Sequence, residues 1–218
     1  MRELTLRFAV AATLALGSMS GSLSQAGDQP SRETLTKAVD RYLSDHGDLC
    51  VGKFTWPRVV TPQDRQDKTN DAVQLPVLER LGLVQATDIA APAVAPTAAD
   101  EVGKSYSLTA KGHRYYLRKN RVTVGAHGMP TVHDADLCVA HLSLDKVVKW
   151  SPPEPAHGGL ESLVRYTYRV KAADWMADPQ ARAVFPVVDR IIRNEGNLLM
   201  SVNVRLENGK WEPVLPTL

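Results

Sequence analysis

Apolar residues recur at helical spacing in two segments of the first half of the chain. The first segment lies between Ser31 and Gly47 and predicts a helix over residues 32–46. Its apolar side is formed by Leu35, Val39, Tyr42 and Leu43. The second segment begins at Asn70 or Asp71 and ends before Gly82, and Pro76 inside it predicts a kinked helix.

Two strands and a third helix are predicted after this helix. Residues 82–89 and 104–109 have strand character, and the Ala/Pro-rich segment between them has no periodicity, which indicates a loop. The stretch "AKGHRYYLRK" then predicts a helix over residues 110–119.

In the second half of the chain the apolar pattern has a period of two. It predicts strands over residues 136–150 and 160–172, a helix over residues 178–194, and a hairpin turning at Asn208-Gly209. The predicted order is β-β-α-β-β, with one helix packed on a curved antiparallel sheet. The expected fold class is therefore α+β. The expected parts are a signal peptide (1–26), a region of helices and strands of α+β type (27–120) and an antiparallel sheet with one helix (121–218).

The first region resembles bacterial winged-helix proteins in the stretch "LERLGLV…YSLTAKGHRYYL". The matching residues are Leu78, Leu81, Gly82, Leu83, Val84, Tyr106, Leu108, Thr109 and Gly112. The resemblance implies a winged-helix-like N-terminal part, and DNA binding is the usual activity of that fold. The helix in the reading position offers only Gln74 and Arg80 as base-contacting donors and also carries Asp71 and Glu79. Binding of nucleic acid is therefore not expected, and a DNA-binding regulator is a distant alternative.

The first 26 residues predict an export signal. Arg2 and Arg7 precede an apolar run that starts at Phe8, and small residues lead to a cleavage site after Ala26. A membrane anchor is the alternative, but the apolar run is much shorter than the roughly 20 residues that span a bilayer. We expect a periplasmic or secreted protein with no transmembrane segment after the signal is removed. The net charge of the whole chain is +2, so no general attraction to nucleic acid or anionic lipid is expected.

The two cysteines, Cys50 and Cys138, both follow the predicted cleavage site. An even pair in an exported chain predicts a disulfide bond. A catalytic thiol is the alternative, although no nucleophile motif surrounds either residue.

Basic residues and one tryptophan are the candidate partner-binding residues. Lys111, Arg114, Arg118 and Arg121 would share one face if the helix at 110–119 continued through them. Such a face either is solvated or contacts an envelope protein or an anionic envelope component. The four tryptophans, Trp56, Trp150, Trp175 and Trp211, are expected mainly in the core. Trp175 precedes Asp178-Pro179 at an edge position, so a partly exposed ring that contacts a partner is the alternative for it.

A metal site at His127, His133 and His141 is considered and not favoured. Zinc needs three or four converging ligands, and the spacing of these residues fits no familiar zinc pattern. No phosphate-binding glycine motif and no Gly-x-Ser-x-Gly motif occurs, so no cofactor is expected.

The stretches "VRYTYRVKAADWMADPQARAVFP" and "NGKWEPV" are similar to sequences of an uncharacterised family of exported bacterial proteins. This resemblance implies the compartment and assigns no activity. The sequence thus predicts an exported, non-enzymatic binding protein. The alternative is a small periplasmic hydrolase with its site within residues 127–161.

Overall fold

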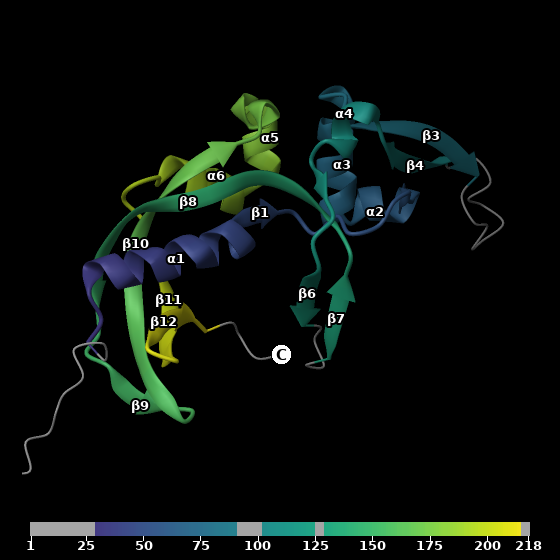
Figure 1. The fold of residues 1–218 in the computed structure, drawn as a ribbon. Helices are drawn as coiled ribbons and strands as arrows, with labels where there is room; N and C mark the ends of the chain where they lie inside the picture. Colours follow the sequence, from purple (N-terminus) through teal and green to yellow (C-terminus); the bar gives the residue numbers. More distant parts are fainter. Residues whose placement is uncertain (1–28, 91–101, 125–128, 215–218) are drawn as a thin grey trace, which may run out of the picture.

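A computed structural model describes residues 29–90, 102–124 and 129–214 of the chain (Figure 1). The described residues form mixed helices and strands around a curled antiparallel sheet, which confirms the α+β class. The predicted signal peptide and the candidate ligand His127 lie outside the described residues.

The large sheet has seven strands, with β1, β8, β10, β11 and β12 in that spatial order. Strand β5 pairs with β8, and β9 pairs with β10. The bounds are β1 Asp48–Cys50, β5 Tyr116–Leu117, β8 Asp136–Trp150, β9 Glu154–Ala156, β10 Gly159–Ala172, β11 Met200–Glu207 and β12 Lys210–Pro213. The register between β8 and β10 slips twice, and such irregularities bend paired strands, as the arched path of β8 and β10 in Figure 1 shows.

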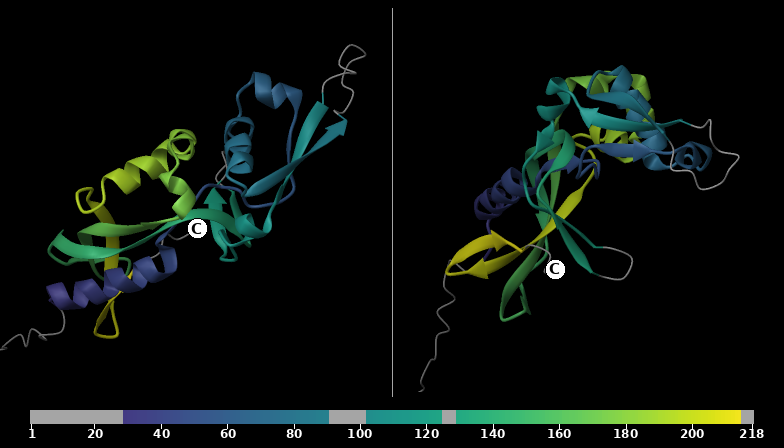
Figure 2. Two further views of the ribbon diagram at one scale, coloured as in Figure 1. Left: turned by 90° about the horizontal axis from the view of Figure 1, so that it is seen from above. Right: turned by 90° about the vertical axis from the view of Figure 1, so that its right-hand side faces the viewer.

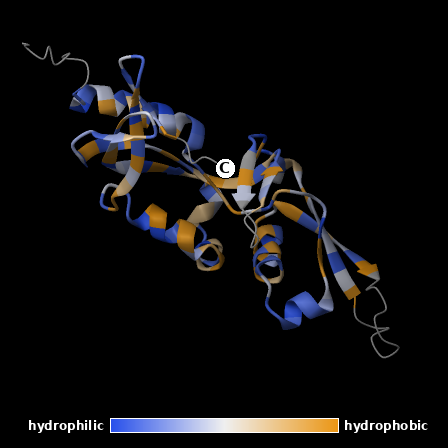
Figure 3. Cartoon of the chain, turned by 90° about the horizontal axis from the view of Figure 1, so that it is seen from below, coloured by the Kyte–Doolittle hydropathy of each residue, from blue (hydrophilic) through white to orange (hydrophobic). Residues whose placement is uncertain are grey.

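Helix α1 (Arg32–His46) packs on this sheet and has the bounds predicted from the sequence. Ser31 caps it, because its side chain accepts a hydrogen bond from the Thr34 backbone N–H. The apolar side of α1 buries Leu35, Val39 and Leu43 against the sheet. The strands supply alternating apolar residues to the same core, and Figure 3 shows this alternation of orange and blue.

A smaller sheet of three strands lies apart from the first, in the order β2-β4-β3 (Figure 2). Helices α2 and α3 belong to the same part of the molecule, and α3 runs through Pro76. The bounds are β2 Arg58–Val60, α2 Pro62–Gln66, α3 Asn70–Arg80, β3 Val84–Ala90 and β4 Val102–Leu108. The segment between β1 and α3 thus contains the short elements β2 and α2.

The core beside the small sheet also contains residues from late in the chain. A 3₁₀ turn η1 (Asp174–Ala177) and helix α5 (Pro179–Val184) bring Trp175, Met176 and Phe185 against Leu75 and Leu78 of α3. The helix predicted over residues 178–194 is divided, because Phe185 leaves helical geometry and Pro186 begins the second helix, α6 (Pro186–Arg193). Each of the two cores therefore combines residues from the first and the second half of the chain.

A winged helix in the N-terminal region is not confirmed. Strands β3 and β4 lie where the sequence predicted two strands and pair with each other, but α1 packs on the large sheet. The helix predicted at residues 110–119 is reduced to α4 (Ala110–His113). After α4 the chain enters β5, where Tyr116 and Leu117 pair with the start of β8. Strands β6 (Arg121–Val124) and β7 (Pro130–His133) form a separate two-stranded sheet.

Candidate functional site

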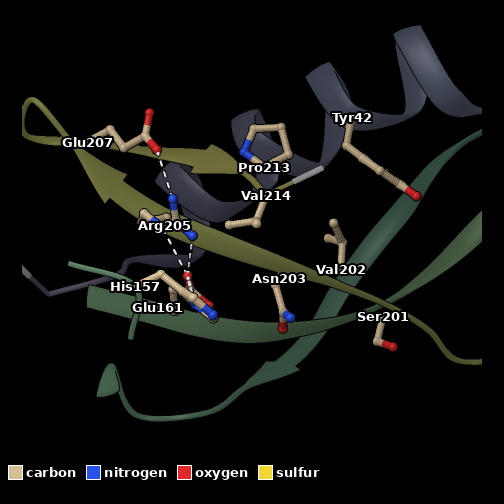
Figure 4. Close-up of a pocket in the computed structure, with 10 residues that line it drawn as sticks. All are labelled: Tyr42, His157, Glu161, Ser201, Val202, Asn203, Arg205, Glu207, Pro213 and Val214. Carbon is tan, nitrogen blue, oxygen red and sulfur yellow. Dashed lines mark hydrogen bonds and ion pairs between the residues drawn. The ribbon is translucent and has the colours of Figure 1, made fainter. Parts of the chain in front are cut away.

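A hollow of about 660 Å³ lies beside β11, between the β9–β10 hairpin and the C-terminal end of α1 (Figure 4). Its lining combines polar residues of β10 and β11 with residues of α1, of the β9–β10 turn and of the chain around the end of β12. The lining residues are Tyr42, His157, Glu161, Ser201, Val202, Asn203, Arg205, Glu207, Pro213 and Val214. We take this hollow as the candidate functional site and call it the β11 hollow.

A charged cluster occupies one end of the β11 hollow. Glu161 and Arg205 are direct partners in the β10–β11 ladder. Arg205 donates from Nε at 2.9 Å and from its Nη2 at 2.6 Å to Glu161 Oε1. The same guanidinium lies 3.6 Å from Glu207 Oε1. One arginine is therefore held between two carboxylates, and its orientation is fixed.

His157 completes this cluster from the β9–β10 turn. The turn has two residues, and both His157 and Gly158 have positive φ, at 50° and 82°. This is the backbone geometry of the tight hairpin turns that match strand twist. His157 Nδ1 lies 3.2 Å from Glu161 Oε1, and 78% of the His157 side chain is exposed. The imidazole therefore faces the solvent at the rim of the hollow.

Glu161 is an ionised acceptor at neutral pH. The hydrogen bond from Arg205 is the largest of the effects that lower the pKa of Glu161, and the contact with His157 adds to it. A carboxyl with a lowered pKa does not hold the proton that a general acid must give away. Glu161 therefore orients Arg205 and His157.

The floor and far end of the β11 hollow come from β11, α1 and the end of β12. Ser201, Asn203 and Arg205 alternate with the buried Val202 and Val204, so their side chains share the outer face of the strand. Tyr42 of α1 stands at the far end, with Pro213 and Val214 beside it (Figure 4). The hollow thus offers hydrogen-bonding groups along one strand and an aromatic and apolar wall.

The contact between His157 and Glu161 resembles one part of a hydrolase site. A histidine oriented by a carboxylate is the base and its orienting group in acyl transfer. No hydroxyl group of the described residues other than Thr123 has a hydrogen bond with a histidine. Ser201 lines the hollow, but Figure 4 places it at the opposite end from His157. Ser162 and Ser151 contact each other, since Ser162 Oγ donates a hydrogen bond to the Ser151 carbonyl at 2.8 Å, and this bond joins the ends of β8 and β10.

The predicted disulfide is confirmed. Cys50 and Cys138 are bonded with an S–S distance of 2.05 Å and join β1 to β8. Neither sulfur is therefore free to act as a nucleophile in this structure.

The predicted basic helix face is wrong. Lys111 lies in α4, Arg114 and Arg118 lie beyond its end, and Arg121 begins β6. The helix stops because the Tyr115 carbonyl accepts a hydrogen bond from the Cys138 N–H at 2.8 Å, and the next residues pair with β8. Lys111 itself donates to the Leu81 carbonyl at 2.8 Å.

Trp175 lies in the core, as expected for the tryptophans in general, and the partly exposed ring considered for it is wrong. Only 5% of the residue is exposed, and its ring makes edge contacts with Tyr115 and Phe185 at centroid distances of 6.1 and 6.0 Å. The η1 turn directs the indole inward because the chain continues at once into α5, which packs on α3. The ring is therefore core, and a partner cannot reach it in this structure.

The structure does not bring the described candidate metal ligands together. His133 lies in β7, where its ring stacks on Phe54 at 3.7 Å between centroids and its Nε2 lies 2.9 Å from Thr123 Oγ1. His141 lies in β8, where its Nδ1 is 2.8 Å from Asp48 Oδ1. Within residues 29–90, 102–124 and 129–214, no three His, Cys, Asp or Glu residues are grouped as metal ligands.

The two donors considered for DNA contact have partners within the protein. Gln74 donates to the Val184 carbonyl at 3.1 Å, and Arg80 pairs with Asp178 at 2.7 Å. Both contacts join α3 to the segment that contains α5. Both donors are therefore engaged within the protein, although 46% of the Arg80 side chain stays exposed.

Sequence reasoning missed Tyr42, Asn203 and Arg205 as site residues. The alternation in "SVNVRLE" shows that Ser201, Asn203 and Arg205 share one face of a strand. It does not show which residues of β10 lie opposite, because that depends on the register of the ladder.

Comparison with known proteins finds no relative: the chain matches no family model, no curated protein and no solved structure. Among the described helices, none has the length and apolar character needed to cross a membrane.

Proposed function

We propose that the chain is an exported protein that binds an envelope component in the β11 hollow and catalyses no reaction. The observation that carries this proposal is the fixed cluster of Glu161, Arg205 and His157 at an open hollow whose floor continues with Asn203 and Ser201. Apart from His157, which belongs to the β9–β10 turn, these side chains stand on paired strands, which hold binding groups in place better than loops do.

The ligand that suits this lining is a neutral, hydroxyl-rich group, such as the sugar of an envelope polysaccharide. Glu161 and Glu207 accept hydrogen bonds, Arg205 donates them, and Asn203 does both. The single guanidinium is shared by two carboxylates, so the cluster has no surplus positive charge for an anion. Tyr42 offers an aromatic surface on which a sugar ring can stack.

Binding is tested with purified protein and an insoluble envelope polysaccharide, peptidoglycan, in a co-sedimentation assay. We expect the wild-type protein to sediment with the polysaccharide and the Asn203→Ala variant to sediment much less. Asn197→Ala is the matched control, because Asn197 is exposed in the connection before β11 and does not line the hollow. Equal sedimentation of both variants would show that the hollow is not the binding site.

Export is tested by the intact mass of the protein recovered from fractionated cells. We expect a periplasmic or extracellular species that begins at Gly27 and that gains two hydrogen atoms on reduction of the disulfide. The disulfide supports this compartment, since such bonds persist in oxidising environments. A full-length cytoplasmic species would contradict the proposal.

A small hydrolase is the second candidate, and the contact between His157 and Glu161 favours it. Its site would use His157 as base and a nucleophile brought close by the substrate or by movement of the chain. Hydrolysis of an activated ester by the wild-type protein, abolished in His157→Ala, would replace the binding proposal with this one. A rate that is equal in both proteins would exclude it.

A further inference from the structure

A second hollow is lined by residues of β1, β8 and β10 and of the segment after α4. Figure 1 shows where β1 and β8 approach that segment, between the two parts of the molecule. The hollow has a volume of about 340 Å³. The lining residues are Asp48, Arg114, Tyr115, Leu117, Cys138, Val139, Ala140, His141, Lys171, Ala172 and Ala173. We call it the β8 hollow, and it shares no lining residue with the β11 hollow.

Three of these residues form a row across the sheet. Asp48 of β1 is the ladder partner of His141 in β8, and His141 is the ladder partner of Lys171 in β10. Direct partners in antiparallel strands have side chains on the same face of the sheet, with Cβ atoms about 5 Å apart. Lys171 therefore lies beside the imidazole of His141 at the floor of the hollow.

Asp48 is the one carboxylate in the lining, and two groups already bind it. His141 Nδ1 lies 2.8 Å from Oδ1, and Lys119 Nζ lies 2.7 Å from Oδ2, while only 6% of the Asp48 side chain is exposed. Burial alone would raise the pKa of Asp48, but the hydrogen bonds from Lys119 and His141 outweigh it and lower the pKa. Lys119 and His141 therefore already bind the Asp48 carboxylate, and its negative charge is not available to neutralise the other cations of the lining.

Two cations of the lining remain without an acidic partner among the described residues. Arg114 enters from the chain after α4 and Lys171 from β10, and neither makes an ion pair within the described ranges. Both are exposed, and they line the same hollow from two different segments of the chain. The hollow therefore has a surplus of positive charge that no described side chain of the protein neutralises.

We propose that the β8 hollow binds a phosphate group between Arg114 and Lys171, with His141 at its floor. A guanidinium presents a planar fork of donors that fits phosphate oxygens, and a lysine adds a compact charge. The disulfide fixes β1 to β8 and so holds Asp48, and with it His141 and Lys119, in place. The phosphate can belong to a free ion or to a lipid headgroup, and the experiment separates the two.

Binding of inorganic phosphate to the wild-type protein is measured by calorimetry at low ionic strength. We expect the Arg114→Ala and Lys171→Ala variants to bind about tenfold more weakly each, because a hydrogen bond to a charged group contributes about one factor of ten. The matched control is the double variant Arg118→Ala/Lys146→Ala, compared with Arg114→Ala/Lys171→Ala. Arg118 follows Arg114 closely in the sequence, and Lys146 lies on β8, the strand that pairs with β10. Both are exposed, and neither lines the hollow.

The outcomes either support the proposal or overturn it. Loss of phosphate binding in Arg114→Ala/Lys171→Ala with retention in the control supports it. If the same protein also binds vesicles of phosphatidylglycerol and free phosphate competes, the phosphate belongs to a lipid; binding of phosphate without vesicles indicates the free ion. The proposal is overturned if the wild-type protein binds neither phosphate nor these vesicles, or if the control loses as much binding as the test variant, which would show attraction to net charge alone.

Discussion

Cys50 of β1 and Cys138 of β8 lie directly opposite each other in an antiparallel ladder, and the bond between them joins positions 88 residues apart in the sequence. The residues between them include the small sheet, α3 and β5. One covalent bond therefore closes the loop that carries most of the smaller part of the molecule.

Removal of this bond lowers the free energy of unfolding. The double variant Cys50→Ser/Cys138→Ser is expected to lose about 4 kcal/mol, because a closed loop of this length restricts the unfolded chain. Urea unfolding with and without reductant measures the effect. Reductant should lower the stability of the wild-type protein and leave the double variant unchanged; a wild-type protein indifferent to reductant would contradict the prediction.

A second prediction concerns a buried ion cluster at the start of α3. Lys53 Nζ and Arg58 Nη2 lie 2.6 and 2.5 Å from the Asp71 carboxylate, and the Lys53 side chain is only 4% exposed. Asp71→Asn leaves the Lys53 charge without its partner, so we expect a loss of about 3 kcal/mol at pH 7. The control Asp40→Asn changes an exposed carboxylate of α1 and should have little effect.

The same cluster predicts that the free energy of unfolding decreases at acidic pH. Burial would raise the pKa of Asp71, but hydrogen bonds from Arg58 and Lys53 outweigh burial and lower it. A folded pKa below the unfolded pKa means that the carboxylate stabilises the fold above the unfolded pKa, and that this contribution is lost as the pH falls toward the folded pKa. Urea unfolding from about pH 6 down to about pH 2 should therefore show the difference between wild type and Asp71→Asn shrinking below about pH 4. A difference that is constant over this range would contradict the assignment.

Elements with a long, regular apolar pattern were predictable from the sequence. The helix at 32–46 and the strand at 136–150 have the expected bounds, because local propensity, capping and the apolar face all favour the same structure there. The hairpin at Asn208-Gly209 was predictable for the same reason, since both residues take the positive φ that such a turn requires.

Features that depend on contacts distant in sequence were not predictable. The helical pattern of residues 110–119 is overridden at Tyr115, where β8 supplies backbone hydrogen bonds. The apolar side of α1 predicts that this helix is packed, but it does not show that the large sheet is its partner. The charged cluster of the β11 hollow depends on the register that sets Glu161 opposite Arg205, 44 residues away.

The burial of Trp175 gives a fourth prediction. Trp175→Ala removes a ring that packs between Tyr115 and Phe185, so we expect a loss of about 4 kcal/mol in the free energy of unfolding. Thermal or urea unfolding measures it. Val187→Ala, at a position of α6 that is 71% exposed, is the control and should change stability by less than about 0.5 kcal/mol. A stable Trp175→Ala variant would show that the ring is not part of the core.

The glycine of the stretch "LTAKG" gives the last prediction. Gly112 is buried in α4, and a Cβ atom built on it would lie 2.0 Å from the Leu83 carbonyl oxygen, so the two backbone segments touch at this point. Thr109 joins the same two segments by hydrogen bonds, because its Oγ1 donates to the Gly82 carbonyl at 2.7 Å and accepts from the Gly112 N–H at 3.1 Å. The residues that resemble a winged-helix signature are therefore used here to fasten α4 to the turn after α3. Gly112→Ala must separate these segments and is expected to cost about 2 kcal/mol, whereas Ala110→Ser, at an exposed position of the same helix, should cost little. If urea unfolding gives equal stabilities for the two variants, the close approach does not constrain the fold, and the role of Gly112 lies elsewhere.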